Sequence, residues 1–366
     1  MRLALVEPYY GGSHKAWADG LVSHSDLDVR LVTHPARFWK WRMHGAFLTL
    51  AEELSDVVES GWLPDVVLAS SMMDVAAFAG AVRNVVPSVP IATYFHESQF
   101  TYPLSPADRA DLTYQMKNWA SAAVSDLVIF NSEYHRSVFA EESMRFLNAF
   151  PEYKHVHRVD DVLDASIVLP VGVDLSGLVG DKVASGDAPL IVWNQRWEHD
   201  KGPEELKAIV QLLIDAGVDF RMAMCGEVFV SVPPTFAQVT EMLGDRLIHK
   251  GYAARDKYES ILLEASVVLS TAEQEFFGIG VVEAIAAGAH PVLPNRLVYP
   301  ERIRAVGGDP SRSLFNDPQE AVTLVEQALG ADVGQSLRMG AQRYHWSAVS
   351  VQYDDVLRSL ANVRGS

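Results

Sequence analysis

The chain has 366 residues, which favours two domains of comparable size over a single domain. Its residues are 49% hydrophobic and 21% charged, a balance typical of globular proteins and not of disordered ones. The net charge of −17 repels polyanions, so a nucleic-acid partner requires a local basic patch. The single cysteine, Cys225, excludes an intrachain disulfide and a Cys-rich zinc site, and we interpret it as a buried strand thiol.

The residues before Glu7 are too few for the apolar core of a signal peptide or for a membrane span. We therefore expect a cytoplasmic protein without a membrane partner.

Short aliphatic and β-branched runs recur along the chain, separated by segments with helical spacing or by polar turns. In the first half they cover residues 2–8, 28–34, 65–71, 89–96 and 126–132. After about residue 180 the same pattern of apolar runs recurs, at residues 190–195, 220–227, 247–252, 267–272 and 290–295. This alternation predicts an α/β fold of two Rossmann-like, doubly wound domains, each built on a parallel sheet.

Residues 167–189 are rich in Gly, Asp, Ser and Pro, the composition of a linker and hinge. We predict an N-terminal Rossmann-like domain over residues 1–176 and a C-terminal Rossmann-like domain over residues 177–345. Residues 346–366 have helical spacing and are predicted to return to the N-terminal domain. Facing carboxyl edges of the two sheets predict a cleft for a nucleotide and a second substrate.

The strongest chemical signal is E-F-F-G-I-G-V-V-E, residues 275–283, which follows an apolar strand and opens a helix. Glu275 and Glu283 are a little over two helical turns apart, so both carboxylates can lie on one side. Backbone amides at this helix N-terminus suit a diphosphate, and carboxylates accept hydrogen bonds from sugar hydroxyls. These amides belong to Phe277, Gly278, Ile279 and Gly280. The alternative is a solvent-facing helix with two incidental glutamates.

A second signal follows the first strand of the C-terminal half, where Asn194, Arg196 and Lys201 lie in a strand-end loop. We predict that Asn194 contacts the nucleotide and that the two cations clamp the leaving diphosphate without a metal. Ion pairing of these cations with Glu198 or Asp200 is the competing interpretation.

In the N-terminal half, Gly11 and Gly12 follow the first strand and allow close approach of a ligand, although a tight turn explains them equally well. The full G-x-G-x-x-G pattern of dehydrogenases is lacking. His96, Glu97 and Gln99 follow another strand, where polar groups suit sugar hydroxyls, while a hydrogen-bonded core histidine is the alternative for His96.

Asn131 and Ser132, which follow a further strand, are typical of a helix cap. Four potential metal ligands, His14, His96, Asp74 and Asp126, are scattered along the chain. We therefore expect neither a metal nor a cofactor. The absence of a G-x-S-x-G motif argues against a serine hydrolase.

The Glu275–Glu283 segment and the Arg196, Lys201 pair resemble retaining GT-B glycosyltransferases of the glycogen-synthase-like and mannosyltransferase-like group. More narrowly, ordered segments between Glu7 and Glu301 resemble the tRNA-queuosine alpha-mannosyltransferase family. These segments are E-P-Y-Y-G-G-S-H-K, F-W-K-W-R, Y-F-H-E-S-Q-F-T-Y-P, R-W-E-H-D-K-G-P-E, T-A-E-Q-E-F-F-G and L-V-Y-P-E.

The resemblance implies GDP-mannose as donor and the cyclopentenediol of queuosine in an aspartate tRNA as acceptor. It places the ribose hydroxyls on Glu283, the diphosphate on Arg196 and Lys201, and the sugar on Glu275 with the amides of residues 278–280. His96 would contact the transferred sugar or shape the acceptor site. The implied reaction is a same-face substitution without a protein nucleophile, protected from water by domain closure.

Residues 35–45 support a tRNA acceptor, because this segment places three cations among three aromatic rings. The cations are Arg37, Lys40 and Arg42, and the rings are those of Phe38, Trp39 and Trp41. Cations beside aromatic rings suit phosphate contacts and stacking on an unpaired base. An amphipathic segment anchored in the core is the alternative. A lipid or small-glycoside acceptor, and a non-catalytic nucleotide-binding module, are the other functions that the sequence leaves open.

Overall fold

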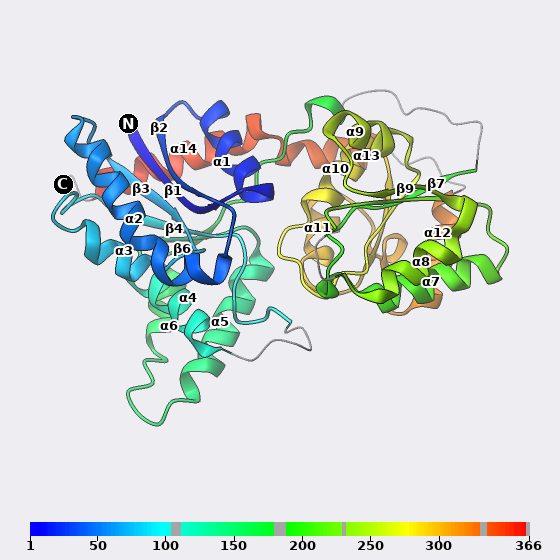
Figure 1. The fold of residues 1–366 in the computed structure, drawn as a ribbon, viewed down its shortest axis with the longest axis horizontal. Coiled ribbons are helices and arrows are strands. Elements are labelled where there is room, and N and C mark those ends of the chain that lie inside the picture. Colours follow the sequence, from blue (N-terminus) through cyan, green and yellow to red (C-terminus); the bar gives the residue numbers. More distant parts are fainter. Residues whose placement is uncertain (104–110, 179–187, 229–231, 330–334, 364–366) are drawn as a thin grey trace. The chain divides into compact units, whose positions relative to one another are not determined.

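The computed structural model describes residues 1–103, 111–178, 188–228, 232–329 and 335–363 (Figure 1). Residue contacts divide the chain into two compact units. Unit 1 comprises Met1–Gly172 with Trp346–Ser366, and unit 2 comprises Val173–His345. The first boundary lies between residues 172 and 173, whereas composition predicts it between 176 and 177. Residues 179–187 of the predicted linker lie outside the described residues.

Unit 1 is built on a parallel sheet with the strand order β2-β1-β3-β4-β5-β6. Its strands are β1 (Arg2–Tyr10), β2 (Asp28–Pro35), β3 (Val66–Ser70), β4 (Ile91–Phe95), β5 (Leu127–Phe130) and β6 (Ser166–Val168). Its helices are α1 (Gly12–His24), α2 (Trp39–Glu59), α3 (Val75–Val82), α4 (Leu112–Val124), α5 (Glu133–Asn148), α6 (Arg158–Asp164) and α14 (Trp346–Val363). Strands β3 and β4 are buried throughout, as expected for a sheet covered on both faces.

Unit 2 has a second parallel sheet, with the order β12-β11-β10-β7-β8-β9. Its strands are β7 (Leu190–Trp193), β8 (Arg221–Cys225), β9 (Leu247–Gly251), β10 (Val267–Leu269), β11 (His290–Pro294) and β12 (Leu314–Phe315). Its α-helices are α7 (Pro203–Asp215), α8 (Pro234–Leu243), α9 (Arg255–Glu264), α10 (Ile279–Ala287), α11 (Tyr299–Ala305), α12 (Pro318–Leu329) and α13 (Gln335–Ala341).

The predicted α/β class is confirmed, and each of the ten predicted strands is present. The prediction missed β6 and β12, which contain three and two residues and are too short to show a period. Cys225 is buried at the end of β8, as interpreted from the sequence. Burial raises the pKa of its thiol to about 12.

Helix α14 packs on unit 1 through Trp346, which is almost fully buried. The red α14 lies beside the blue α1 in Figure 1. A Cβ atom added to Gly20 in α1 would lie 2.1 Å from Cε2 of Trp346, and one added to Gly172 would lie 2.3 Å from its Cδ2. The indole therefore fits only because both positions lack a side chain. Trp17 adds a hydrogen bond from its Nε1 to the hydroxyl of Tyr353, 3.1 Å away.

We expect Gly20→Ala to lower the free energy of unfolding by about 1–3 kcal/mol, because the new methyl overlaps a buried indole. Gly80 in α3 is the matched control, since it is also helical but a Cβ there meets nothing within 4 Å. Gly80→Ala should therefore leave stability unchanged or raise it by about 0.5–1 kcal/mol. Urea unfolding of both variants measures the difference, and equal stability would contradict the packing described for Trp346.

Candidate active site

The loops that follow β7 and β10 form the candidate site of unit 2. These two strands are neighbours, although two strands and three α-helices separate them in sequence. The strand order reverses between them, and such a reversal opens a crevice at the carboxyl ends of the strands. Asn194, Arg196 and Lys201 follow β7, while Glu275 and the start of α10 follow β10. The predicted donor residues thus come from the two loops that flank this reversal.

Lys201 is held in place by three oxygen atoms. Its Nζ donates to the carbonyl of Gln274 at 2.7 Å and lies 3.0 Å from Oδ2 of Asp200. Oε2 of Glu275 lies 3.8 Å from the same nitrogen. Lys201 is 7% exposed, so it has little freedom to move away from Glu275. The structure brings these two predicted residues together.

Arg196 is more accessible than Lys201, with a side chain that is 46% exposed. Its Nη2 lies 3.2 Å from Oε2 of Glu198. Burial raises the pKa of Glu198, and the nearby guanidinium opposes that shift. Both ion pairs of the competing interpretation, Arg196–Glu198 and Lys201–Asp200, are therefore present. They compensate these cations in the described structure, and the diphosphate role stays a prediction.

Glu275 accepts hydrogen bonds from the backbone that follows it. Its Oε1 accepts from the amides of Phe276, Phe277 and Gly278 at 3.1, 3.2 and 3.0 Å. Two amides that the sequence predicts for a ligand, those of Phe277 and Gly278, are therefore already bound to Glu275. Phe277 is also buried. The amides of Ile279 and Gly280 lie in the first turn of α10, where a helix offers no acceptor of its own.

Glu283 lies within α10 and is 7% exposed. Its Oε1 accepts from Nη1 of Arg255 at 2.7 Å, and its Oε2 accepts from the hydroxyl of Tyr258 at 2.9 Å. Burial raises the pKa of Glu283, and these two contacts oppose the shift. Asn194 completes the network, because its Nδ2 donates to the Tyr258 hydroxyl and to the carbonyl of Gly280, both at 2.8 Å.

No pattern in the sequence indicated a role for Arg255 and Tyr258. Both lie on α9, which carries no motif, and only the fold brings them to Glu283. Arg302 was also missed. It is buried between the rings of Phe277 and Tyr344 and donates from Nε to the carbonyl of Phe277 at 3.0 Å. This contact fixes the loop that precedes α10.

In unit 1, His96 follows β4 and lies beside Glu7 of β1 and His14 of α1. Nδ1 of His14 lies 3.1 Å and Nε2 of His96 lies 3.7 Å from Oε2 of Glu7. The expectation that His14 and His96 are scattered is therefore wrong, because folding brings their donor atoms and that of Glu7 within 4.8 Å of one another. Residues far apart in sequence converge here because parallel strands end at a common edge.

Gly11 and Gly12 join β1 to α1. A Cβ atom on Gly11 would lie 2.4 Å from Cβ of Ala36, so this position is closely packed against a neighbouring loop. Gly12 has a φ of +51°, which favours glycine, and open space around it. These features fit a tight turn and leave the ligand role a prediction.

Other polar residues of unit 1 bind one another. Nε2 of Gln99 donates to Oε1 of Glu97 at 3.2 Å, and the backbone amide of Gln99 donates to Asn118. Ser132 caps α5 by accepting from the amide of His135, as predicted.

The basic aromatic segment, residues 35–45, contains half-buried and exposed side chains. Arg42 donates to Nδ1 of His34 at 3.2 Å, and Trp39 packs against Tyr114 with ring centroids 5.2 Å apart. Phe38 and Trp41, by contrast, are 79% and 65% exposed. Arg37 and Lys40 are also exposed. Phe38 and Trp41 are therefore the exposed rings of the segment, while Trp39 is half-buried, and its role in acceptor binding stays a prediction.

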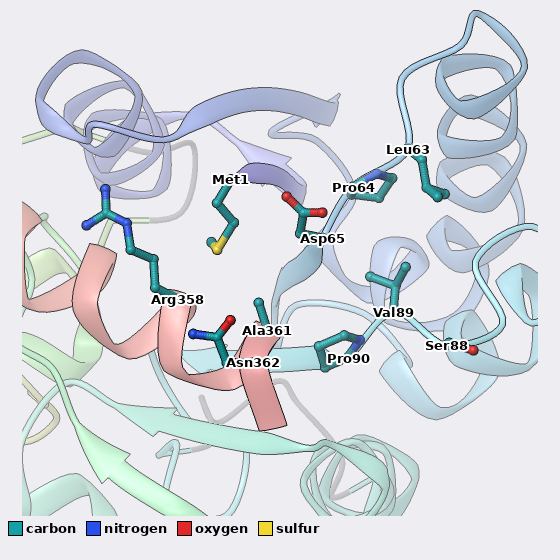
Figure 2. Close-up of a pocket in the computed structure, with 10 residues that line it drawn as sticks. All are labelled: Met1, Leu63, Pro64, Asp65, Ser88, Val89, Pro90, Arg358, Ala361 and Asn362. Carbon is teal, nitrogen blue, oxygen red and sulfur yellow. The ribbon is translucent and has the colours of Figure 1, made fainter. Parts of the chain in front are cut away.

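A pocket of about 670 Å³ lies elsewhere in unit 1, between the amino ends of strands and α14 (Figure 2). Met1, Asp65 and Pro90 precede β1, β3 and β4, and Arg358 and Ala361 belong to α14. Catalytic loops of parallel sheets lie at the opposite, carboxyl edge. We therefore do not assign the predicted chemistry to this pocket.

None of the helices in the described part of the chain combines the length and apolar character that a bilayer crossing requires.

Comparison with known proteins identifies both halves of the chain. Residues 2–173 match the family model described as tRNA-queuosine alpha-mannosyltransferase N-terminal, and residues 180–330 match glycosyl transferases group 1. A tRNA-queuosine alpha-mannosyltransferase from Drosophila melanogaster is 32% identical over 311 residues, covering 82% of this chain and 81% of the relative. The chain belongs to the tRNA-queuosine alpha-mannosyltransferase family. It is a glycosyltransferase.

Solved structures support the GT-B fold of this family member. Sucrose-phosphate synthase from Thermosynechococcus elongatus matches with a TM-score of 0.73 at 15% identity, over 99% of this chain and 100% of that one. Anabaena HepE in complex with UDP matches with a TM-score of 0.70 at 15% identity, over 98% and 100%. At such identities the likeness establishes the fold alone.

In this mannosyltransferase family member, Glu275 is expected to stabilise the loop that carries it. Glu275→Ala removes the acceptor of three backbone amides and should lower the free energy of unfolding by about 1–3 kcal/mol. Glu275→Gln retains an acceptor oxygen and should lose less. Thermal denaturation compares the two, with Glu273→Ala as control because Glu273 is an exposed neighbour. Equal melting temperatures for all three variants would exclude this capping role.

Proposed function

We propose that this chain transfers mannose from GDP-mannose to the cyclopentenediol of queuosine in an aspartate tRNA, with retention of configuration at the sugar. Membership of the tRNA-queuosine alpha-mannosyltransferase family supports mannose as the sugar and queuosine-containing tRNA as the acceptor. The choice of guanosine as the nucleoside of the donor rests on the family resemblance. A cytoplasmic location follows from the proposed acceptor.

The observation that carries the proposal is the convergence of Lys201 and Glu275 at the strand reversal of unit 2. A departing nucleoside diphosphate develops negative charge on oxygen, and cations fixed beforehand stabilise that charge without reorganisation. Lys201 is fixed by its contacts with Gln274 and Asp200. Arg196 is accessible enough to turn from Glu198 to a phosphate. We propose that these two cations act without a metal.

Glu283 is proposed to bind the ribose hydroxyls of the donor. A carboxylate offers about four lone-pair sites, so contacts with Arg255 and Tyr258 leave capacity for a ligand. Tyr258 is a donor here, because burial raises its pKa well above the usual value and keeps the phenol protonated. The network thus holds the acceptor oxygens of Glu283 in a fixed orientation.

The reaction needs no protein nucleophile in this proposal. The leaving phosphate helps to deprotonate the acceptor hydroxyl on the same face of the sugar, while the sugar passes through an oxocarbenium-like state. The protein contributes orientation of both substrates and stabilisation of the charge on the diphosphate.

The acceptor side is supported by the exposed rings of Phe38 and Trp41 beside the exposed cations Arg37 and Lys40. Aromatic rings stack on unpaired bases, and cations attract phosphates. Phe38 also has a φ of +53°, which lies in the left-handed region that residues other than glycine rarely adopt. Backbone strain of this kind is often retained at binding sites.

The deciding experiment supplies purified protein with GDP-mannose or UDP-glucose and with queuosine-containing or queuosine-free tRNA. Mass spectrometry of the tRNA then detects an added hexose. Transfer from GDP-mannose to queuosine-containing tRNA alone supports the proposal. Donor hydrolysis without transfer to any tRNA would point to another acceptor, and a preference for UDP-glucose would overturn the donor.

Two substitutions separate the roles proposed on the donor side. Arg196→Ala should lower kcat by about 100- to 1000-fold, because it removes a charge that acts mainly in the transition state. Glu283→Gln should instead raise the KM for the donor by about 10- to 100-fold, since a charged hydrogen-bond acceptor is lost. Steady-state kinetics resolve the two effects. Arg304→Ala and Glu326→Gln, at exposed positions of unit 2, are the charge-matched controls.

On the acceptor side, Phe38→Leu and Trp41→Leu should each raise the KM for tRNA by about 5- to 100-fold, because a stacking surface is lost. Donor hydrolysis in the absence of tRNA should not change. Leu48→Ala is the control, since Leu48 is an exposed apolar residue on the same helix as Trp41. Unchanged tRNA KM values in both ring variants would place the acceptor site elsewhere.

A further inference from the structure

The cluster of Glu7, His14 and His96 is built like a site for a divalent metal ion. Three elements of unit 1 supply it, since Glu7 lies in β1, His14 in α1 and His96 directly after β4. The cluster offers one carboxylate oxygen and two imidazole nitrogens within 4.8 Å of one another. Zinc bonds of about 2.0–2.2 Å to such atoms place neighbouring ligands about 3–3.7 Å apart. The Glu7–His14 and Glu7–His96 distances, 3.1 and 3.7 Å, match this spacing.

The charge balance of the cluster calls for a cation. Glu7 is fully buried, and among the described residues both of its ionic partners are histidines. A buried carboxylate is costly unless a positive charge compensates it. The rings of Trp17, Tyr94 and His14 pack around His96 with centroids 4.1–4.7 Å away, which fixes the orientation of its imidazole. A divalent ion bound by these residues would compensate the buried carboxylate of Glu7.

His96 provides a second, independent observation. Its side chain is 10% exposed, and its Nε2 is buried without a hydrogen-bond partner among the described residues. A neutral imidazole with an unshared Nε2 lone pair is the usual form of a metal-binding histidine. This nitrogen also faces the carboxylate of Glu7, whose Oε2 lies 3.7 Å away.

The second oxygen of Glu7 is oriented by the backbone. Its Oε1 accepts from the amide of Tyr9 at 2.8 Å, which leaves Oε2 facing both histidines. Metal sites commonly use such a hydrogen bond on the ligand to fix its geometry.

We infer that Glu7, His14 and His96 bind one divalent transition-metal ion, with zinc as the best fit to two imidazoles and one carboxylate. The ion joins the start of α1 to the ends of β1 and β4, which are separated in the sheet by β3. This inference assigns Nε2 of His96 to the metal rather than to the transferred sugar. It does not involve Arg196 or Lys201, the two cations proposed to bind the diphosphate, and it does not depend on the proposed function.

The test is metal content, measured on the full-length chain without a histidine tag. After chelation and dialysis, the protein is equilibrated with excess Zn²⁺, desalted and analysed by mass spectrometry for metal and by amino-acid analysis for protein. We expect about one Zn²⁺ per chain in the wild type and a several-fold lower content in Glu7→Gln and His96→Gln. Mg²⁺ should not be retained, because nitrogen ligands disfavour it.

His34→Gln is the matched control, because His34 is another buried histidine of unit 1, and its Nε2 lies 3.3 Å from Oε1 of Glu53. This variant should retain the wild-type zinc content. Circular dichroism identifies any variant that has not folded, and for such a variant His14→Gln takes its place. Zinc should also raise the melting temperature of the wild type but not that of the folded ligand variants. A wild type that retains no zinc, or ligand variants that retain as much as the control, would overturn the inference.

Discussion

The reversal of strand order between β7 and β10 constrains the chemistry of unit 2. The segments that leave these neighbouring strands go to different parts of the sheet, so the loops that follow the two strands diverge at its carboxyl edge. The residues around that edge can be polar without interrupting the core, because they lie beyond the last ladder hydrogen bond. Asn194, Lys201 and Glu275 occupy this edge, whereas the strands that lead to it are fully buried.

Compensation of buried charge then determines how these residues are held. Lys201 and Glu283 are both more than nine-tenths buried, and each has partners of opposite charge or with suitable hydrogen-bonding groups. Removal of one member of such a set leaves the other uncompensated, so every side chain depends on the rest. The side chains are therefore oriented before a ligand arrives.

Local patterns in the sequence predicted the fold well, because each buried strand is a short apolar run that directly reflects its burial. The Glu275–Glu283 spacing and the cations after β7 were also visible, because each lies in one continuous segment. Arg255, Tyr258, Glu7 and His14 were not assigned roles. Glu283 is distant in sequence from Arg255 and Tyr258, and His96 is distant from Glu7 and His14, so no spacing rule connects them. The sequence also did not predict which aromatic rings are exposed. Trp39 and Trp41 lie in the same segment, but Trp39 packs against Tyr114, whereas Trp41 is exposed.

The return of α14 to unit 1 has a consequence for the order of folding during synthesis. Unit 2 is continuous in sequence and is complete before residue 346 is translated. Unit 1 is discontinuous, and the groove between Gly20 and Gly172 stays open until the Trp346 indole arrives. Unit 2 can therefore fold before the core of unit 1 is complete. Unit 1, which begins at Met1, completes its core only after α14 has been synthesised and has packed.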